Sequence, residues 1–171
     1  MTTTIPAPSE RPQTLVFDLP IPPRGTARNV AASTHWRVRH KATKAYHEDV
    51  QTIGKQVMSQ EGYLPKGVNE QYRGQITTKG VKQIVNKIRT VFPEPYFERA
   101  KYSITYGVKT NGKDGGYRPK DDGNAVDGAK SAIDALVRIG LIKDDKSDYL
   151  KLGEVVIDKT FTGLRLEFTA I

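Results

Sequence analysis

The chain has 171 residues, 37% of them hydrophobic and 27% charged. A single domain of this size can bury a stable core without disulfide bonds or structural metal ions. It contains no cysteine, which excludes disulfide bonds and thiolate metal sites and favours a reducing compartment. No apolar run approaches the ~20 residues that span a bilayer. We therefore expect a cytoplasmic protein with no membrane contact.

Charge is distributed unevenly along this basic chain, whose formal net charge is +8. Residues 24–47 hold six lysines or arginines, all three histidines and no acid. Residues 121–148 hold seven of the eleven aspartates and no glutamate. A basic surface favours polyanions, usually nucleic acid, although charge alone also fits a generic basic protein.

The first half of the chain predicts one strand and two helices. Residues 1–12 are expected to be a flexible leader. TLVFDL at 14–19 predicts a strand ended by prolines, and residues 24–41 a basic loop or arm. Apolar residues at three- and four-residue spacing predict a helix over 42–58 and a second, basic helix over 78–90, with an irregular segment at 64–77 between them.

The second half predicts a strand, a helix and a pair of strands. Residues 101–109 alternate as a strand does, and residues 111–122 form a loop rich in glycine and charge. Residues 124–139 predict a helix capped by Gly140. Residues 150–159 and 163–171 predict two strands joined by a tight turn. The order predicts a single α/β (α+β) domain over 13–171, with a small mixed sheet and two to three helices.

The aspartate-rich stretch at residues 121–148 contains the residues that we expect to bind a metal ion and cleave a phosphodiester. Asp121 and Asp122 precede a predicted helix, and Asp145 follows it. Carboxylates from two loops suit a hard cation such as Mg²⁺, and phosphodiester cleavage needs such a metal with a positive group at the phosphate. We therefore expect Asp121, Asp122 and Asp145 to hold the metal and Lys130 to contact the scissile phosphate. Asn124 would orient the loop or a ligand.

A purely structural interpretation of the same residues stays open. Asp121, Asp122 and Asn124 stand where a helix needs a cap and where its dipole favours negative charge. Lys130 is spaced to form surface ion pairs with Asp127 or Asp134. Spacing alone does not decide between the two interpretations.

Several of these elements recur in order in a known family. The segment resembles the RusA family of Holliday junction resolvases, which show a D-x-D-N-like motif, a lysine on the next helix, an Asp-Ala-Leu step, a glycine and a paired aspartate before a strand. LVFDLPIPPRG and VVIDKTFTGLRLEFTAI also resemble the family's opening strand and closing hairpin. The matching positions here are Asp121-Asp122-Gly123-Asn124, Lys130, Asp134-Ala135-Leu136, Gly140 and Asp144-Asp145.

The resemblance implies a symmetric homodimer that cuts four-way DNA junctions with Mg²⁺ or Mn²⁺ and needs no organic cofactor. Twofold symmetry would present two identical sites to a branched DNA. The chain departs from the pattern at Gly123, where the family has its second aspartate, so Asp122 or Asp127 would have to serve as a ligand. Residues 61–99 are an apparent insertion.

The remaining expected site residues bind DNA or support the ligands. The three histidines lack a compelling zinc spacing. Supporting roles fall to Asn124, Asp134 and Asp144. Basic residues expected to contact phosphates are Arg28, Arg37, Arg39, Lys41, Lys44, Arg118 and Lys120.

Three functions compete on this basis. The first is a Mg²⁺-dependent endodeoxyribonuclease that resolves four-way junctions. The second is a DNA-binding dimer in which the departure at Gly123 has silenced the chemistry. The third is a related nuclease that acts on other branched DNA.

Overall fold

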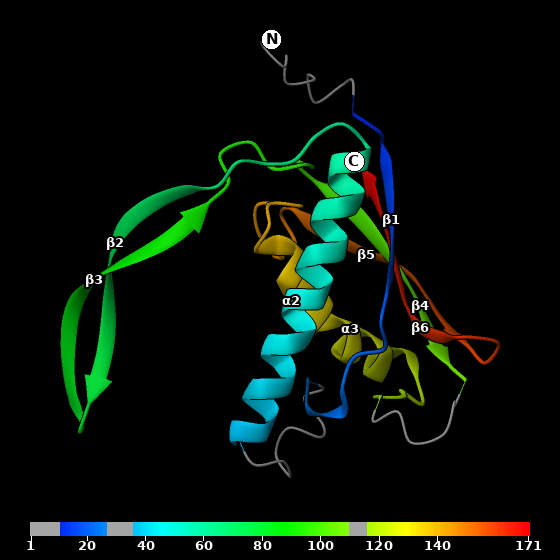
Figure 1. The fold of residues 1–171 in the computed structure, drawn as a ribbon, viewed down its shortest axis with the longest axis horizontal. Coiled ribbons are helices and arrows are strands. Elements are labelled where there is room, and N and C mark those ends of the chain that lie inside the picture. Colours follow the sequence, from blue (N-terminus) through cyan, green and yellow to red (C-terminus); the bar gives the residue numbers. More distant parts are fainter. Residues whose placement is uncertain (1–10, 27–35, 110–115) are drawn as a thin grey trace.

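A four-stranded sheet carries two long helices on one face (Figure 1). The computed structural model describes residues 11–26, 36–109 and 116–171. The strands are β1 (Thr14–Leu19), β4 (Ala100–Val108), β5 (Leu150–Asp158) and β6 (Thr162–Ala170), in the order β1-β6-β4-β5. β4 pairs in parallel with β5, and the other pairings are antiparallel. The predicted mixed sheet and α+β class are confirmed.

Alternation along the strands explains which face of the sheet is covered. Every second residue of β1, β4 and β6 is buried, and the residues between them are mostly exposed. The helices cover the buried face, so one core lies between the two layers. Its largest fully buried side chains from the strands are Phe17, Ile104, Tyr106, Leu164, Leu166 and Phe168.

Among the described residues, the long helices are α2 (Trp36–Gln60) and α3 (Asp122–Val137), and a short 3-10 helix, η2 (Arg24–Thr26), precedes them. The helices predicted over 42–58 and 124–139 are therefore present. α2 begins earlier than expected, so residues 36–41, which we expected in a basic loop, are helical. Gly140 has a φ of 85° and ends α3 as predicted, with Leu141 N donating to Leu136 O at 3.2 Å.

Gly54 lies where α2 packs against the C-terminal end of α3. A Cβ atom added to it would lie 2.6 Å from Ile139 Cδ1 and 2.7 Å from Leu136 Cδ2. A larger residue at this position would push the ends of these two side chains aside. The contact brings other side chains of α2, including His47, against α3.

The predicted basic helix over 78–90 is wrong, and so is the irregular segment at 64–77. The chain instead forms a hairpin of β2 (Val68–Thr78) and β3 (Val81–Val91) that extends away from the sheet (Figure 1). Lys79 and Gly80 make its two-residue turn with φ values of 50° and 81°, which is the geometry of a type I′ turn. Valine and isoleucine happened to recur at helical spacing, but two residues with positive φ cannot continue a helix.

The expected tight hairpin between the last two strands is also wrong. β5 and β6 lie on opposite sides of β4 and do not pair with each other. The strand lengths were nearly right, but the neighbour of each strand depends on the whole sheet.

Two further expectations concern the N-terminal leader and membrane-spanning helices. Residues 1–10 of the expected leader lie outside the described residues, whereas Arg11 is buried and donates from Nη1 to Pro95 O at 2.9 Å. In the part of the chain that the structure describes, no helix combines the length and apolarity needed to cross a bilayer.

Candidate functional site

Asp121 caps the N-terminal end of α3. Its Oδ1 accepts a hydrogen bond from Asn124 N at 2.9 Å, and its Oδ2 accepts one from Asn124 Nδ2 at 2.6 Å. The cap satisfies a main-chain N–H that the helix leaves without a partner. Tyr117 OH donates to Asn124 Oδ1 at 3.5 Å, so Asn124 links the cap to the loop before it. Asn124 thus holds the cap and the preceding loop together, and its expected orienting role stays a prediction.

Asp122 and Gly123 form the exposed first turn of α3. A Cβ atom at Gly123 would meet only Asp121 Oδ1, at 3.5 Å. The position that departs from the family pattern thus has room for a side chain.

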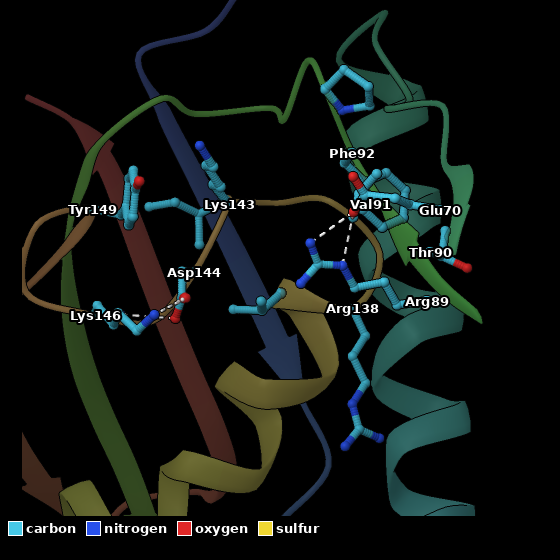
Figure 2. A pocket seen from close by; sticks show the side chains of 13 residues that line it. Glu70, Arg89, Thr90, Val91, Phe92, Arg138, Lys143, Asp144, Lys146 and Tyr149 are labelled. Atoms are coloured by element: carbon cyan, nitrogen blue, oxygen red, sulfur yellow. Dashed lines mark hydrogen bonds and ion pairs between the residues drawn. The ribbon is translucent and has the colours of Figure 1, made fainter. Parts of the chain in front are cut away.

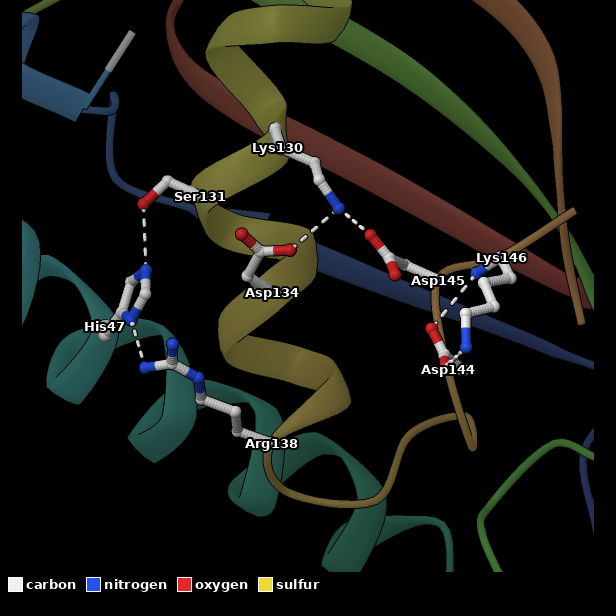
Figure 3. A network of polar contacts seen from close by, with 8 residues as sticks. All are labelled: His47, Lys130, Ser131, Asp134, Arg138, Asp144, Asp145 and Lys146. Atoms are coloured by element: carbon white, nitrogen blue, oxygen red, sulfur yellow. Dashed lines mark hydrogen bonds and ion pairs between the residues drawn. The ribbon is translucent and has the colours of Figure 1, made fainter. Parts of the chain in front are cut away.

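Lys130 is the centre of a charged cluster on the solvent side of α3 (Figure 3). Its Nζ lies 2.8 Å from Asp134 Oδ1 and forms a second ion pair with Asp145 from the loop before β5. The side chains of Lys130, Asp134 and Asp145 are 46%, 40% and 33% exposed. Water reaches all three groups, so these ion pairs stabilise the fold little. The cluster is therefore partly exposed and contributes little to stability.

The neighbouring aspartates take separate positions. Asp144 Oδ2 pairs with Lys146 Nζ at 2.9 Å, and its Oδ1 accepts from Lys146 N at 3.3 Å (Figure 3). Asp127 is half-buried on α3, one turn before Lys130. Asp144 thus bonds within its own loop.

The structure does not gather the expected metal ligands into one group. Asp121 and Lys130 are nine residues apart, which is about 13 Å along a helix axis. Among residues 11–26, 36–109 and 116–171, no three acidic or histidine side chains lie close enough to hold a metal ion. The pair that does converge is Asp134 with Asp145, and Asp134 was expected only to support the ligands.

Asp134 and Asp145 provide carboxylate oxygens, the ligand type that Mg²⁺ prefers. Both carboxylates approach one cationic centre, the ammonium group of Lys130. Mg²⁺ prefers oxygen ligands and is often held by one or two carboxylates while it keeps several waters. Asp134 and Asp145 could therefore hold a hydrated Mg²⁺ if Lys130 turned toward a phosphate.

On the side of α3 that faces α2 lies a second polar cluster, which sequence reasoning missed (Figure 3). Arg138 Nη1 lies 3.1 Å from His47 Nδ1, and His47 Nε2 lies 2.9 Å from Ser131 Oγ. Arginine only donates, so Nδ1 accepts and Nε2 carries the proton that is donated to the serine. His47 and Ser131 are buried, at 9% and 7% exposure.

His47 is held neutral by this environment. Burial lowers the pKa of His47, and the positive charge of Arg138 lowers it further, although Asp134 and Ser131 act in the opposite direction. The cluster ties α2 to α3 directly behind Lys130. The sequence signal for this cluster was weak, because it consisted only of polar residues at positions where the helical period predicts apolar ones.

Four of the expected phosphate contacts lie on the first turns of α2. Arg37, Lys41 and Lys44 follow one another at helical spacing on one side, and Arg39 lies on another side near Gly25. These side chains are exposed. Arg28, the fifth basic residue of this group, lies outside the described residues.

The other two expected phosphate contacts flank the start of α3. The guanidinium of Arg118 donates to the main-chain oxygens of Val108, Lys109 and Gly116, so it holds the end of β4 to the loop before α3. Lys120 is exposed next to the Asp121 cap. The structure thus gives Arg118 an anchoring role.

A pocket of about 630 Å³ lies between the base of the hairpin, the end of α3 and the loop before β5 (Figure 2). Cations and aromatic rings line it, and Lys143 Nζ lies 5.5 Å from the centroid of the Tyr149 ring. Its other cationic and aromatic lining residues are Arg89, Phe92, Arg138 and Lys146. The pocket joins the hairpin to the loop that carries Asp144.

Comparison with models of known protein families finds no match, and comparison with curated proteins finds no relative. The arguments about function therefore rest on the residues and their geometry.

Proposed function

We propose that this protein is a metal-dependent endonuclease that cuts branched DNA, with four-way junctions as its preferred substrate and a homodimer as its working form. The observation that carries the proposal is Lys130 held between Asp134 and Asp145 on an exposed face. A nuclease of this kind needs a cation-binding carboxylate pair and a mobile positive group beside it. The net charge of +8 and the ordered motif that resembles the RusA family support the same function.

The residues of the cluster divide the work. Asp145, with Asp134 or Asp127, would hold Mg²⁺ or Mn²⁺ between α3 and the loop before β5. The ion would activate a water and stabilise charge on the phosphate. Lys130, released from its carboxylates, would donate to a non-bridging phosphate oxygen and stabilise the negative charge that develops there. Asp121 and Asn124 would keep the start of α3 in place, and Asp122 remains a further candidate ligand.

A cleavage assay tests this proposal. Wild-type protein is incubated with an end-labelled four-way junction in Mg²⁺, in Mn²⁺ or in EDTA. We expect paired nicks with either metal and none in EDTA. Asp145→Asn and Lys130→Ala should each lower the cleavage rate by about 100-fold or more while junction binding survives. Lys151→Ala removes an exposed lysine on β5 and serves as the matched control.

Two results would contradict the proposal. One is cleavage by Asp145→Asn at the wild-type rate, and the other is full activity in EDTA. A preference for three-way or flap substrates over the four-way junction would keep the chemistry but change the substrate.

The second candidate function is a DNA-binding protein without cleavage. It is favoured by the pairing of Lys130 with both of its carboxylates and by the use of Asp121 as a helix cap. It predicts junction binding that weakens steeply with salt and no nicks with any divalent metal. The same assay therefore separates the two candidates.

A further inference from the structure

The β2–β3 hairpin extends away from the sheet as an arm (Figure 1). Each strand has 11 residues, which corresponds to a length of about 35 Å. The two strands pair with each other along their whole length and, in the described part of the chain, join no other sheet. A two-stranded sheet of this kind has no core of its own and is marginal in water without a partner.

The arm is strongly basic. It carries five cationic residues and one acidic residue, Glu70, which gives a difference of four positive charges. Glu70 Oε2 lies 2.7 Å from Arg89 Nη2, so this pair neutralises itself. The four cations that remain are Arg73, Lys79, Lys82 and Lys87.

The apolar residues of the arm do not form a single face. Ile84 and Ile88 are 76% and 67% exposed and share one face with Arg73 and Lys82, because directly paired residues point to the same side. The opposite face has Lys87, the Glu70–Arg89 pair and the other apolar side chains of the arm, which are Val68, Tyr72, Ile76, Val81, Val85 and Val91. Each face of the ribbon therefore combines cations with apolar groups. An apolar protein surface would leave these charges without partners.

Duplex DNA fits this pattern better. A two-stranded ribbon fits the major groove, where cations meet phosphates and apolar side chains meet thymine methyl groups. The polar residues of the arm, including Asn86, Gln71 and Gln75, can bond to phosphates or base edges.

The base of the arm leads toward the candidate site. Arg89, Thr90 and Val91 of β3 line the pocket described above, and Asp144 lies on its other side (Figure 2). Lys143 and Arg138 add positive charge along the way. Asp145 follows Asp144 in the chain, so the pocket adjoins the loop that supplies one carboxylate of the Lys130 cluster.

We propose that the β2–β3 hairpin is a DNA-binding arm that lies in the major groove of a duplex and directs its backbone toward the Lys130 cluster. The identification of the polyanion as DNA rests on the proposed function. The competing occupant of the arm is a second copy of this chain.

Salt dependence of binding tests the arm directly. The variant Arg73→Gln/Lys82→Gln/Lys87→Gln is compared with wild type by fluorescence anisotropy, on a four-way junction and a linear duplex, in EDTA so that no cleavage occurs. Each phosphate contact contributes about 0.9 to the slope of log K against log salt. We expect the slope to fall by about 2 to 3 for both substrates. A control variant, Lys55→Gln/Lys151→Gln/Lys159→Gln, removes three exposed lysines elsewhere and should change the slope by less than about 1.

Equal slope changes in the arm variant and the control variant would overturn the proposal, since the effect would then be one of net charge. A second combination of results would also overturn it. In this combination the arm variant keeps the wild-type slope, and analytical ultracentrifugation shows that Ile84→Ser/Ile88→Ser converts a dimer into a monomer. Binding and cleavage are measured separately. If the salt slope depends on the arm but wild-type protein never nicks DNA, the endonuclease proposal is refuted and the proposal of a DNA-binding arm stands. If the protein nicks junctions but the arm variant has the same salt slope as wild type, the DNA-binding arm is refuted and the endonuclease stands.

Discussion

At the scale of single residues, two glycines of α3 have opposite surroundings. Gly128 is buried, and a Cβ atom there would lie 2.8 Å from Tyr117 Cδ1 and 3.0 Å from Tyr106 Cε2. Gly123 is exposed, and its nearest contact would be Asp121 Oδ1 at 3.5 Å. The same substitution should therefore have opposite effects at two positions five residues apart.

We expect Gly128→Ala to lower the free energy of unfolding by roughly 1 kcal/mol or more, because crowding two packed rings outweighs the helix propensity that alanine adds. Gly123→Ala should raise it by up to about 1 kcal/mol. Urea denaturation followed by circular dichroism measures both. A Gly128→Ala protein as stable as Gly123→Ala would show that the Tyr106 and Tyr117 rings are loosely packed.

His47 should make stability depend on pH. The native state lowers the pKa of His47, so the unfolded chain, whose histidine has a pKa of about 6.5, binds a proton first as pH falls. The contribution of His47 is complete above pH 6.5 and is lost as pH falls from there toward the lower native value. His47→Gln should therefore lose less stability than wild type between pH 7 and pH 5.

The comparison uses only the difference between the two pH values, so any general destabilisation by His47→Gln cancels. Chemical denaturation of both proteins at each pH gives the measurement. An identical loss in wild type and variant would mean that the Arg138–His47–Ser131 contacts do not persist in solution.

At the scale of elements, the hairpin and the helices illustrate two different uses of apolar residues. Val81, Ile84, Val85 and Ile88 have the spacing of an amphipathic helix, yet they lie on a ribbon whose two faces are both mostly exposed. The signals that favour strands were present in the same segment: β-branched residues are frequent, and Lys79-Gly80 separates two runs of equal length. Periodicity alone misled because a short run satisfies both periods.

The helices were predictable because their stripes are long. α3 buries eight residues over four turns, and its start and end are marked by Asp121 and Gly140. Capping and periodicity agree there, so local chemistry and tertiary packing point to the same element.

At the scale of the whole molecule, the arm contributes little to the core. The residues that form the core cluster come from the sheet, the two helices and the loops around them, and none comes from β2 or β3. Replacing residues 69–90 by a two-residue Asn-Gly turn should therefore leave the melting temperature within about 4 °C of wild type, the shift expected for ~1 kcal/mol.

Calorimetry of the shortened protein provides this measurement, and cooperative unfolding would show that the core is intact. A melting temperature lower by more than 10 °C would show that the arm stabilises the fold, through the core or through a second copy of the chain. The shortened protein would also serve as a second reagent for the DNA-binding experiment.

Local chemistry in the sequence determined the two helices, the strands of the sheet, the cap at Asp121 and the spacing that pairs Lys130 with Asp134, because each depends on residues a few positions apart. Only the tertiary structure decided that β4 separates β5 from β6, that residues 68–91 form a projecting ribbon, and that Asp145 rather than Asp121 meets Lys130. These features join residues through space, and their free energy comes from packing of the entire sheet and both helices, which no short window of sequence contains.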